Sequence, residues 1–299
     1  MTSVLSIGNF DGLHQGHQKL LRRMTDLARQ NGLCSVVISY EDNPAYILAP
    51  KSLPMTLLPA SVKKRRLEEL GIDQVELLHF DAVLAHTSAE EFLHNTLIPR
   101  YQPRIMVMGY DSHFGHQRSG DFNFLLNQKE KYGYDLEYVE PFLYQGRPLS
   151  SSLIRGKLLR GELREANQLL AKPYTLYGKV VEGARLGKEL GFPTANLELT
   201  DPHQLIPQTG IYFCQVTLRE QRYFGLTDIG VSPTLKQSPR TEVETYIIDF
   251  QSEIYGAQLE VALLKYLREE KLFTDKAELK RAIQADLDQA RALIRSRKW

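Results

Sequence analysis

The sequence predicts two domains, an α/β domain built on a parallel sheet and a small all-β domain that carries a terminal helix. Three observations lead to this fold class. The length of 299 residues is roughly twice a common domain size. Up to about residue 170, short β-like runs alternate with longer helical stretches. From Tyr174 onward Val, Ile, Tyr and Thr dominate, and turns follow roughly every eight to twelve residues.

In the first half, periodicity separates strands from helices. The runs of strand character are 4–7, 35–40, 74–80, 104–109 and 135–142. The helical stretches are 17–32, 60–71, 88–101 and 122–133. Gly32, Gly71 and Gly133 stand where three of these helices must stop. This alternation is typical of a parallel sheet with helices on its faces, in which ligands bind beyond the carboxyl ends of the strands.

The first domain ends with two short helices over 150–173, joined at Gly161. Six strand-like runs follow, at 174–183, 194–199, 210–220, 222–230, 243–250 and 259–267. They predict a small antiparallel barrel or sandwich. The last stretch, 275–299, has apolar residues at helical spacing and predicts a helix packed on the strands. We place the domains at 1–172 and 173–299.

Charge and hydropathy exclude several classes of protein. Acidic and basic residues nearly balance to a net charge of +1, and no long basic tract points to a nucleic-acid partner. No apolar run approaches the length of a membrane span, and the N-terminus has no signal-peptide pattern. The sequence therefore predicts a cytoplasmic protein that acts on small molecules, without nucleic-acid or membrane partners. It gives no indication of an oligomeric state.

The segment GNFDGLHQGHQ, from Gly8 to Gln18, predicts a phosphate-binding site. Glycines between a strand and a helix allow close approach to a ligand, and the helix N-terminus favours an anion. His14 and His17 share a helical face and can donate hydrogen bonds to phosphate oxygens during nucleotidyl transfer. A glycine-rich turn with two surface histidines is the alternative. A zinc site on the two histidines is a further alternative, but the segment has no cysteine or third histidine to complete the coordination set.

Two further segments of the first domain carry polar groups suited to a nucleotide. Ser151 and Ser152 stand at a helix start, where serines often serve only as caps. Capping does not account for Arg155, which is placed to reach phosphates bound there. Asp111 follows a strand and suits hydrogen bonds from a ribose or adenine, although a plain Asx turn is an equal alternative.

In the second domain the segment LGFPTANL indicates a nucleotide site. Thr194 offers a hydroxyl to magnesium, and Asn196 offers an amide to phosphate or metal, with a structural turn as the alternative. Glu244 can act as a base towards a substrate hydroxyl, unless its strand face is merely solvated. The nearby GARLGK, from Gly183 to Lys188, is not a P-loop, because its glycines are too close together and Glu189 follows the lysine.

Seven motifs in order resemble the bacterial bifunctional riboflavin kinase/FAD synthetase family. They are GNFDGLHQGH, GYDSHFG, SSSLIR, LGFPTANL, GIYFCQV, the Gly-x-x-x-Ile-Gly-x-x-Pro-Thr run of 225–234, and EIYGAQLEV, and they cover nearly the whole chain. The resemblance implies an N-terminal FMN adenylyltransferase on a Rossmann-like fold. It also implies a C-terminal riboflavin kinase on a six-stranded barrel with a terminal helix.

The resemblance also implies roles for individual residues. Around ATP in the adenylyltransferase it places His14, His17, Ser151, Ser152 and Arg155 at the phosphates, Asp111 near the adenosine, and Gly8, Phe10, Asp11 and Gly16 in the binding loop. In the kinase it places Thr194 and Asn196 at magnesium and phosphates, Gly191 and Pro193 beside them, and Glu244 as the base that activates the ribityl 5′-hydroxyl. Riboflavin, FMN and FAD are then substrates or products, with ATP as co-substrate and Mg²⁺ as cofactor.

Four departures from the family pattern bear on activity. Ser112 stands where an aromatic residue is usual, and Asp42-Asn43-Pro44 replaces a Pro-His-Pro-like loop. In the kinase, Asp228 replaces an amide and Tyr246 replaces a histidine. We expect a two-step enzyme that converts riboflavin to FMN and FMN to FAD. One alternative is an active kinase whose adenylyltransferase is weak or selective for a different flavin or redox state. Another is a flavin- or nucleotide-binding regulatory protein without turnover.

Overall fold

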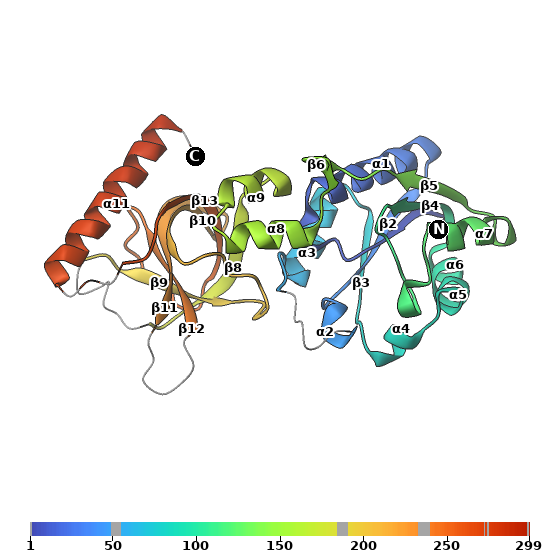
Figure 1. Cartoon of the computed structure of the whole chain (residues 1–299), viewed down its shortest axis with the longest axis horizontal. Coiled ribbons are helices and arrows are strands. Elements are labelled where there is room, and N and C mark those ends of the chain that lie inside the picture. Colours follow the sequence, from blue (N-terminus) through green and yellow to red (C-terminus); the bar gives the residue numbers. More distant parts are fainter. Residues whose placement is uncertain are drawn as a thin grey trace. The chain divides into compact units, whose positions relative to one another are not determined.

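The computed structural model describes residues 2–48, 55–183, 191–232, 240–271, 273, 275–297 and 299. Contacts divide the chain into two compact units, one ending at Ser151 and the other starting at Ser152 (Figure 1). A division by contacts does not locate the limit of an independently folding domain, so the boundary after residue 172 stays a prediction.

The first unit is built on a five-stranded parallel sheet of order β3-β2-β1-β4-β5. Its strands are β1 (Ser3–Ile7), β2 (Cys34–Tyr40), β3 (Gln74–Leu78), β4 (Pro103–Gly109) and β5 (Asp135–Val139). All five coincide with predicted runs. The order reverses between β1 and β4, and the crevice outside the carboxyl ends of these strands is the usual ligand site of such sheets.

Helices connect the strands where the sequence predicted them. They are α1 (Gln15–Asn31), α3 (Ala60–Glu69), the consecutive α5 (Ala89–Phe92), η3 (Leu93–Leu97) and α6 (Ile98–Tyr101), and α7 (Phe122–Tyr132). Gly32 ends α1 in the left-handed region, with φ 63°. The sequence did not predict the short elements η1 (Asp11–Leu13), α2 (Ala45–Leu48), α4 (Ala82–His86), η4 (His116–Arg118), β6 (Leu143–Tyr144) and β7 (Arg147–Pro148). These segments are too short to show a period.

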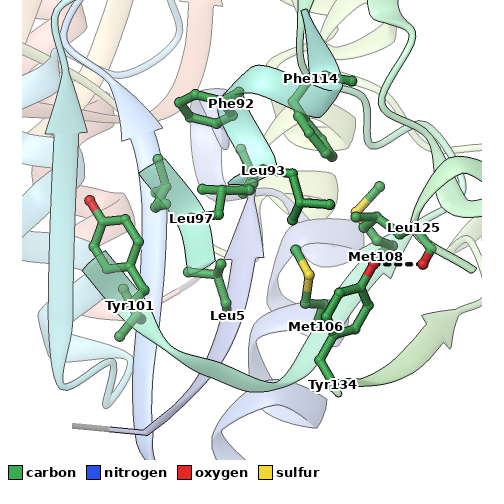
Figure 2. Packing of buried hydrophobic residues seen from close by; sticks show 14 residues of the cluster. Leu5, Phe92, Leu93, Leu97, Tyr101, Met106, Met108, Phe114, Leu125 and Tyr134 are labelled. Carbon is green, nitrogen blue, oxygen red and sulfur yellow. Dashed lines mark hydrogen bonds between the residues drawn. The ribbon is translucent and has the colours of Figure 1, made fainter. Parts of the chain in front are cut away.

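One face of the sheet is covered by the helices between β3 and β4 and by α7. Figure 2 shows Phe92, Leu93 and Leu97 packed toward the strand residues Leu5, Met106 and Met108. The hydroxyl of the buried Tyr134 donates to the Leu125 carbonyl at 2.6 Å, so its polar end is satisfied inside the apolar cluster. This packing holds the strands rigidly, and their carboxyl ends therefore present the following loops in fixed positions.

The second unit contains a closed six-stranded barrel of order β10-β11-β12-β9-β8-β13. The strands are β8 (Tyr174–Val181), β9 (Thr194–Leu199), β10 (Gly210–Leu218), β11 (Gln221–Ser232), β12 (Arg240–Ile247) and β13 (Gln258–Arg268). All six predicted runs are confirmed, and pairing of β10 with β13 closes the sheet, so the open choice between barrel and sandwich resolves to the barrel.

In the described part of the second unit, three helices accompany the barrel. Gly161, with φ 72°, joins α8 (Ser151–Leu159) to α9 (Leu163–Leu170), as predicted. The terminal α11 (Lys276–Ser296) packs against the barrel, where Leu287 and Leu293 meet an apolar cluster that includes Phe213 (Figure 1). In the described part of the chain, no helix is long and apolar enough to cross a membrane.

Candidate active sites

A cavity of about 390 Å³ opens at the carboxyl ends of the strands of the first unit. Its walls are the loops that follow β1, β4 and β5, contributed by Gly8–Asp11, Gly109–Gly115 and Val139–Phe142. His14, His17 and Ser151 line it as well. The loops after β1 and β4 therefore share one cleft, as expected for loops that both emerge at the carboxyl ends of parallel strands.

The glycines of the first loop leave room for aromatic rings. A Cβ on Gly8 would lie 3.1 Å from the ring of Phe10, and one on Gly16 would lie 3.1 Å from the ring of His14. Phe10 itself adopts φ 50°, which is unfavourable for a residue with a side chain, and Gly12 follows with φ 79°. The loop is therefore a strained conformation that its surroundings must maintain.

The two histidines lie against each other at the start of α1. His14 is the N-cap, and its Nδ1 accepts a hydrogen bond from the backbone N–H of His17 at 3.3 Å. In the neutral ring this contact leaves the His14 proton on Nε2. The two rings stack with centroids 3.6 Å apart and an angle of 17° between their planes.

Electrostatics keep His17 uncharged. Burial holds the pKa of His17 well below its ordinary value, and charge on His14 and on Lys63 lowers it further. Within the described residues, Nδ1 of His17 is buried without a hydrogen-bond partner. An unpaired buried polar atom beside a cavity is a common sign that a ligand or water completes the site.

Hydrogen bonds of Asp11 and Ser151 stabilise the loop that follows β1. The carboxylate of Asp11 accepts the backbone N–H groups of Leu57 at 2.9 Å and Leu58 at 3.1 Å. The Ser151 hydroxyl donates to the Asp11 carbonyl at 2.9 Å. The ring of Phe10 meets that of His17 edge to face, with centroids 5.4 Å apart. These contacts give the three residues positioning tasks, while their contact with a nucleotide stays a prediction.

The other predicted residues of the first site divide into two groups. Asp111 lines the cavity beside Tyr110, whose pKa is raised by burial and by the Asp111 carboxylate. Ser152 and Arg155 lie on α8 in the second unit, where Nη1 of Arg155 donates to the Ser152 hydroxyl at 3.4 Å. Their approach to phosphates remains a prediction.

Asn43 and Ser112, which belong to the two departures from the family pattern in the first unit, both line the cavity and both accept backbone hydrogen bonds. The side chain of Asn43 accepts the backbone N–H of Ala45 at 3.1 Å, at the start of α2. The Ser112 hydroxyl accepts the N–H of Gly109 at 3.0 Å and closes the turn after β4. Aromatic surface comes instead from Tyr40 and Phe80, which meet edge to face at 5.3 Å. Sequence reasoning missed both, because isolated aromatic residues at strand ends carry no motif.

In the second unit the barrel brings together the three residues assigned to the kinase. The Thr194 hydroxyl donates to Oε2 of Glu244 at 2.8 Å, and Asn196 lies opposite Glu244 in the pairing of β9 with β12. The amide of Asn196 occupies the space where a Cβ on Gly183 would lie. Glu244 is half-buried, whereas Glu242 on the same strand is exposed. Glu244 differs from Glu242 in its burial and in the hydrogen bond that it accepts from Thr194. The sequence alone did not separate these two carboxylates.

A cavity of about 320 Å³ is lined by Thr194 of this group, whereas Glu244 and Asn196 are not among its lining residues. Pro193, Thr194 and the segment Phe250–Tyr255 line it. Gly191 precedes them with φ 88° and is exposed. The sequence placed Glu253–Tyr255 in the family motif EIYGAQLEV but assigned no residue of the 250–255 segment to the site. Residues 184–190 and 233–239, which include most of GARLGK and the Pro-Thr end of the 225–234 run, lie outside the described residues.

Asp228 and Tyr246, the two departures from the family pattern in the second unit, lie on the same face of the barrel as Glu244. Tyr246 meets Phe192 edge to face at 5.8 Å, within the apolar cluster under α11. Asp228 lies directly opposite Glu244 in the pairing of β11 with β12. Burial raises the pKa of Asp228 to about 7, and the charges of Glu270 and Glu244 add to this while Arg268 opposes it.

We expect Asp228→Asn to stabilise the second unit at pH 8 and to have only about a third of this effect at pH 5. The unfolded carboxyl loses its proton near pH 3.8 and the folded one near 7, so stability falls as pH rises through this window. The gain at pH 8 should be roughly 1–3 kcal/mol, allowing for partial exposure to solvent. Urea unfolding followed by fluorescence of Trp299, the chain's one tryptophan, reports this unit because Trp299 packs on Phe213.

Asp288→Asn, an amide substitution at an exposed position of α11, is the matched control. It should change unfolding equally little at both pH values. An equal effect of Asp228→Asn at pH 5 and pH 8 would show that the carboxyl at position 228 does not titrate differently in the folded chain.

The fold and the two sites together define a class of protein. A glycine-rich loop with a histidine pair lies on a parallel sheet, and a Thr-Glu pair lies on a small barrel. This combination defines a two-domain nucleotide-dependent transferase. The FAD synthetase family model matches residues 1–153, and the riboflavin kinase family model matches residues 170–294. The chain belongs to the bifunctional riboflavin kinase/FMN adenylyltransferase family. It phosphorylates riboflavin to FMN and adenylylates FMN to FAD, using ATP.

Relatives resemble the chain over almost its whole length. The bifunctional riboflavin kinase/FMN adenylyltransferase of Pseudomonas fluorescens is 35% identical over 290 residues, which is 97% of this chain and 92% of the relative. That of Escherichia coli K12 is 35% identical over 284 residues, 95% of this chain and 90% of the relative. A crystal structure described as a macrolide-efflux protein from Streptococcus pneumoniae has a TM-score of 0.87 at 30% identity, covering 97% and 94% of the two chains.

Proposed function

We propose that FMN is adenylylated in the cavity of the first unit and that riboflavin is phosphorylated beside Thr194, Asn196 and Glu244. The observation that carries the first assignment is the stacked His14–His17 pair at the start of α1, which lines the cavity. The hydrogen bond from Thr194 to Glu244 supports the second.

In adenylyl transfer, a phosphate oxygen of FMN forms a bond to the α-phosphorus of ATP, and the bond to the pyrophosphate oxygen breaks. Negative charge grows on the phosphate oxygens during this step. Nε2–H of His14 and the neutral ring of His17 donate hydrogen bonds to this charge, next to the positive end of the α1 dipole. Gly8, Gly16 and Phe10 shape the loop around the phosphates. Neutral donors suit the site because burial would penalise a charged imidazole before substrate binds.

The remaining residues of the first site act in binding. Ser151, Ser152 and Arg155 bind the β- and γ-phosphates, which become the pyrophosphate, and Arg155 stays charged throughout the reaction. Asp111 accepts hydrogen bonds from the adenosine. Asp11 acts through the backbone of Leu57 and Leu58, and so belongs to the framework of the loop.

In riboflavin phosphorylation, Glu244 takes the proton of the ribityl 5′-hydroxyl as its oxygen attacks the γ-phosphorus of ATP, and ADP leaves. The hydrogen bond from Thr194 occupies Oε2 of Glu244 and thereby orients Oε1 as the proton acceptor. Asn196 faces the same group across the strand pair and reaches the phosphates. Gly191 and Pro193 shape the approach to this site.

The donor atoms beside Glu244 suit Mg²⁺. Thr194 and Asn196 offer uncharged oxygens, and the Thr194 hydroxyl keeps free lone pairs while it donates to Glu244. Within the described residues no group of three or more His, Cys, Asp or Glu side chains forms a metal site. Mg²⁺ commonly takes few protein ligands and completes its shell with phosphates and water. Bound there with ATP, the ion would neutralise phosphate charge during transfer.

Product chromatography tests both assignments. Purified protein receives ATP and magnesium with riboflavin in one reaction and with FMN in another. FAD in both reactions is the expected result, and it would show that Ser112 and Asp228 are tolerated. FMN without FAD would favour an adenylyltransferase that is weak or selective for another flavin or redox state, while tight binding without turnover would favour a regulatory protein. Since ATP serves both steps, the proposal places the enzyme in the cytoplasm.

A further inference from the structure

Lys63 is a buried charged residue for which the proposed reaction has no role so far. It lies on α3 and only 4% of its surface is exposed. Its Nζ donates to the carbonyl of Asn9 at 3.1 Å and to that of Tyr40 at 2.8 Å. These carbonyls stand just after β1 and at the end of β2. The ammonium thus ties together two strand ends that open into the cavity.

We propose that Lys63 is a positioning residue for adenylyl transfer, which holds the phosphate loop in its strained conformation through the Asn9 carbonyl. This inference rests on the proposed function of the first unit. The Ser39 hydroxyl also donates to the Asn9 carbonyl, at 3.0 Å, so two donors fix one peptide group. Phe10, the next residue, has φ 50°. Such a conformation persists only where neighbouring contacts enforce it.

The fixed carbonyl also orients the next backbone N–H. A trans peptide group is planar, so its C=O and N–H point in opposite directions. With the Asn9 carbonyl held toward Lys63 and Ser39, the N–H of Phe10 points away from them. Asn9 and Phe10 both line the cavity, and in the described part of the chain this N–H has no acceptor. It is therefore placed as a donor to a bound phosphate.

The charge of Lys63 has a second consequence at the histidines. Burial lowers the pKa of Lys63 to about 8, while the carboxylates of Asp11 and Asp42 partly offset this. Near neutral pH the ammonium is still charged, and this charge helps to lower the pKa of His17. Loss of the ammonium should therefore move the titration of His17 upward as well as loosen the loop.

The test compares Lys63→Met with Lys64→Met, which removes the neighbouring exposed lysine of the same helix. We expect Lys63→Met to lower kcat for FAD formation roughly 10- to 100-fold, because small misplacement of reacting groups is costly. FMN formation from riboflavin by the same preparation should not change. The imidazole signals of His17, followed by NMR, should titrate at higher pH than in the parent chain. Lys64→Met should change none of the three.

A milder variant covers the case in which Lys63→Met disrupts the first unit. Ser39→Ala removes the second donor to the Asn9 carbonyl and should lower kcat for FAD formation roughly 3- to 10-fold, the effect of one net hydrogen bond. Full FAD formation and an unchanged His17 titration in Lys63→Met would overturn the inference, as would full activity in Ser39→Ala. If His17→Ala itself retained FAD formation, the proposed site would be wrong, which is a separate outcome.

Discussion

Replacing His17 with Ala is expected to lower the rate of FAD formation from FMN roughly 10²- to 10³-fold, while FMN formation from riboflavin continues at its original rate. The reason is the loss of a preorganised donor beside phosphate oxygens that gain charge in the transition state. His17 lines the cavity with its ring stacked on that of His14, so its position relative to a bound phosphate is fixed before the reaction. Product chromatography at saturating substrates measures both rates.

The matched control for this variant is His94→Ala. His94 lies on η3, outside the residues that line the cavity, and its ring contacts the Tyr132 hydroxyl at the surface. It should leave both reactions unchanged. Comparable losses of FAD and FMN formation in a folded His17→Ala protein would contradict the assignment of separate sites to the two units.

Replacing Glu244 with Gln should have the reverse effect, lowering FMN formation roughly 10²- to 10⁴-fold and leaving FAD formation from FMN intact. The amide keeps the size of the side chain but cannot accept the proton of the ribityl hydroxyl. An amide oxygen can still accept the hydrogen bond of Thr194, so the local structure should survive. Initial rates from riboflavin and from FMN, measured separately, distinguish the two steps.

Glu242→Gln is the control for this second prediction. Glu242 stands two residues away on the same face of β12, but it is exposed and lies opposite Gly230. It removes an identical charge from the strand without touching Thr194. If both glutamine variants lowered FMN formation by the same factor, the effect would belong to the charge of the strand face and Glu244 would not be the base.

The two variants together separate the proposed enzyme from its alternatives. Opposite losses in His17→Ala and Glu244→Gln require two working sites in one chain. If the unsubstituted protein did not convert FMN to FAD, Ser112 and Asn43 would be the first residues to replace. Their side chains lie in the cavity wall and accept hydrogen bonds from backbone N–H groups. Tyr40 and Phe80, which line the same cavity, would be the next residues to test for contact with a flavin ring.

The sequence by itself determined the order of strands and helices and the pairing of His14 with His17. These properties depend on residues close together in the chain, where apolar period, helix stops and a three-residue spacing act locally. The same holds for α8 and α9, whose junction at Gly161 was predicted from the turn signal. Motif order over the whole chain identified the family before any contact was known.

Only the tertiary structure decided which distant residues meet. Closure of the barrel depends on β10 pairing with β13, and Thr194 reaches Glu244 only because β9 and β12 are neighbours. Lys63 belongs to a run of four basic residues that resembles a solvated helix face, yet it is buried beneath the phosphate loop. Burial, charge and partners of this kind arise when separate elements pack together, and no local pattern in the sequence encodes them.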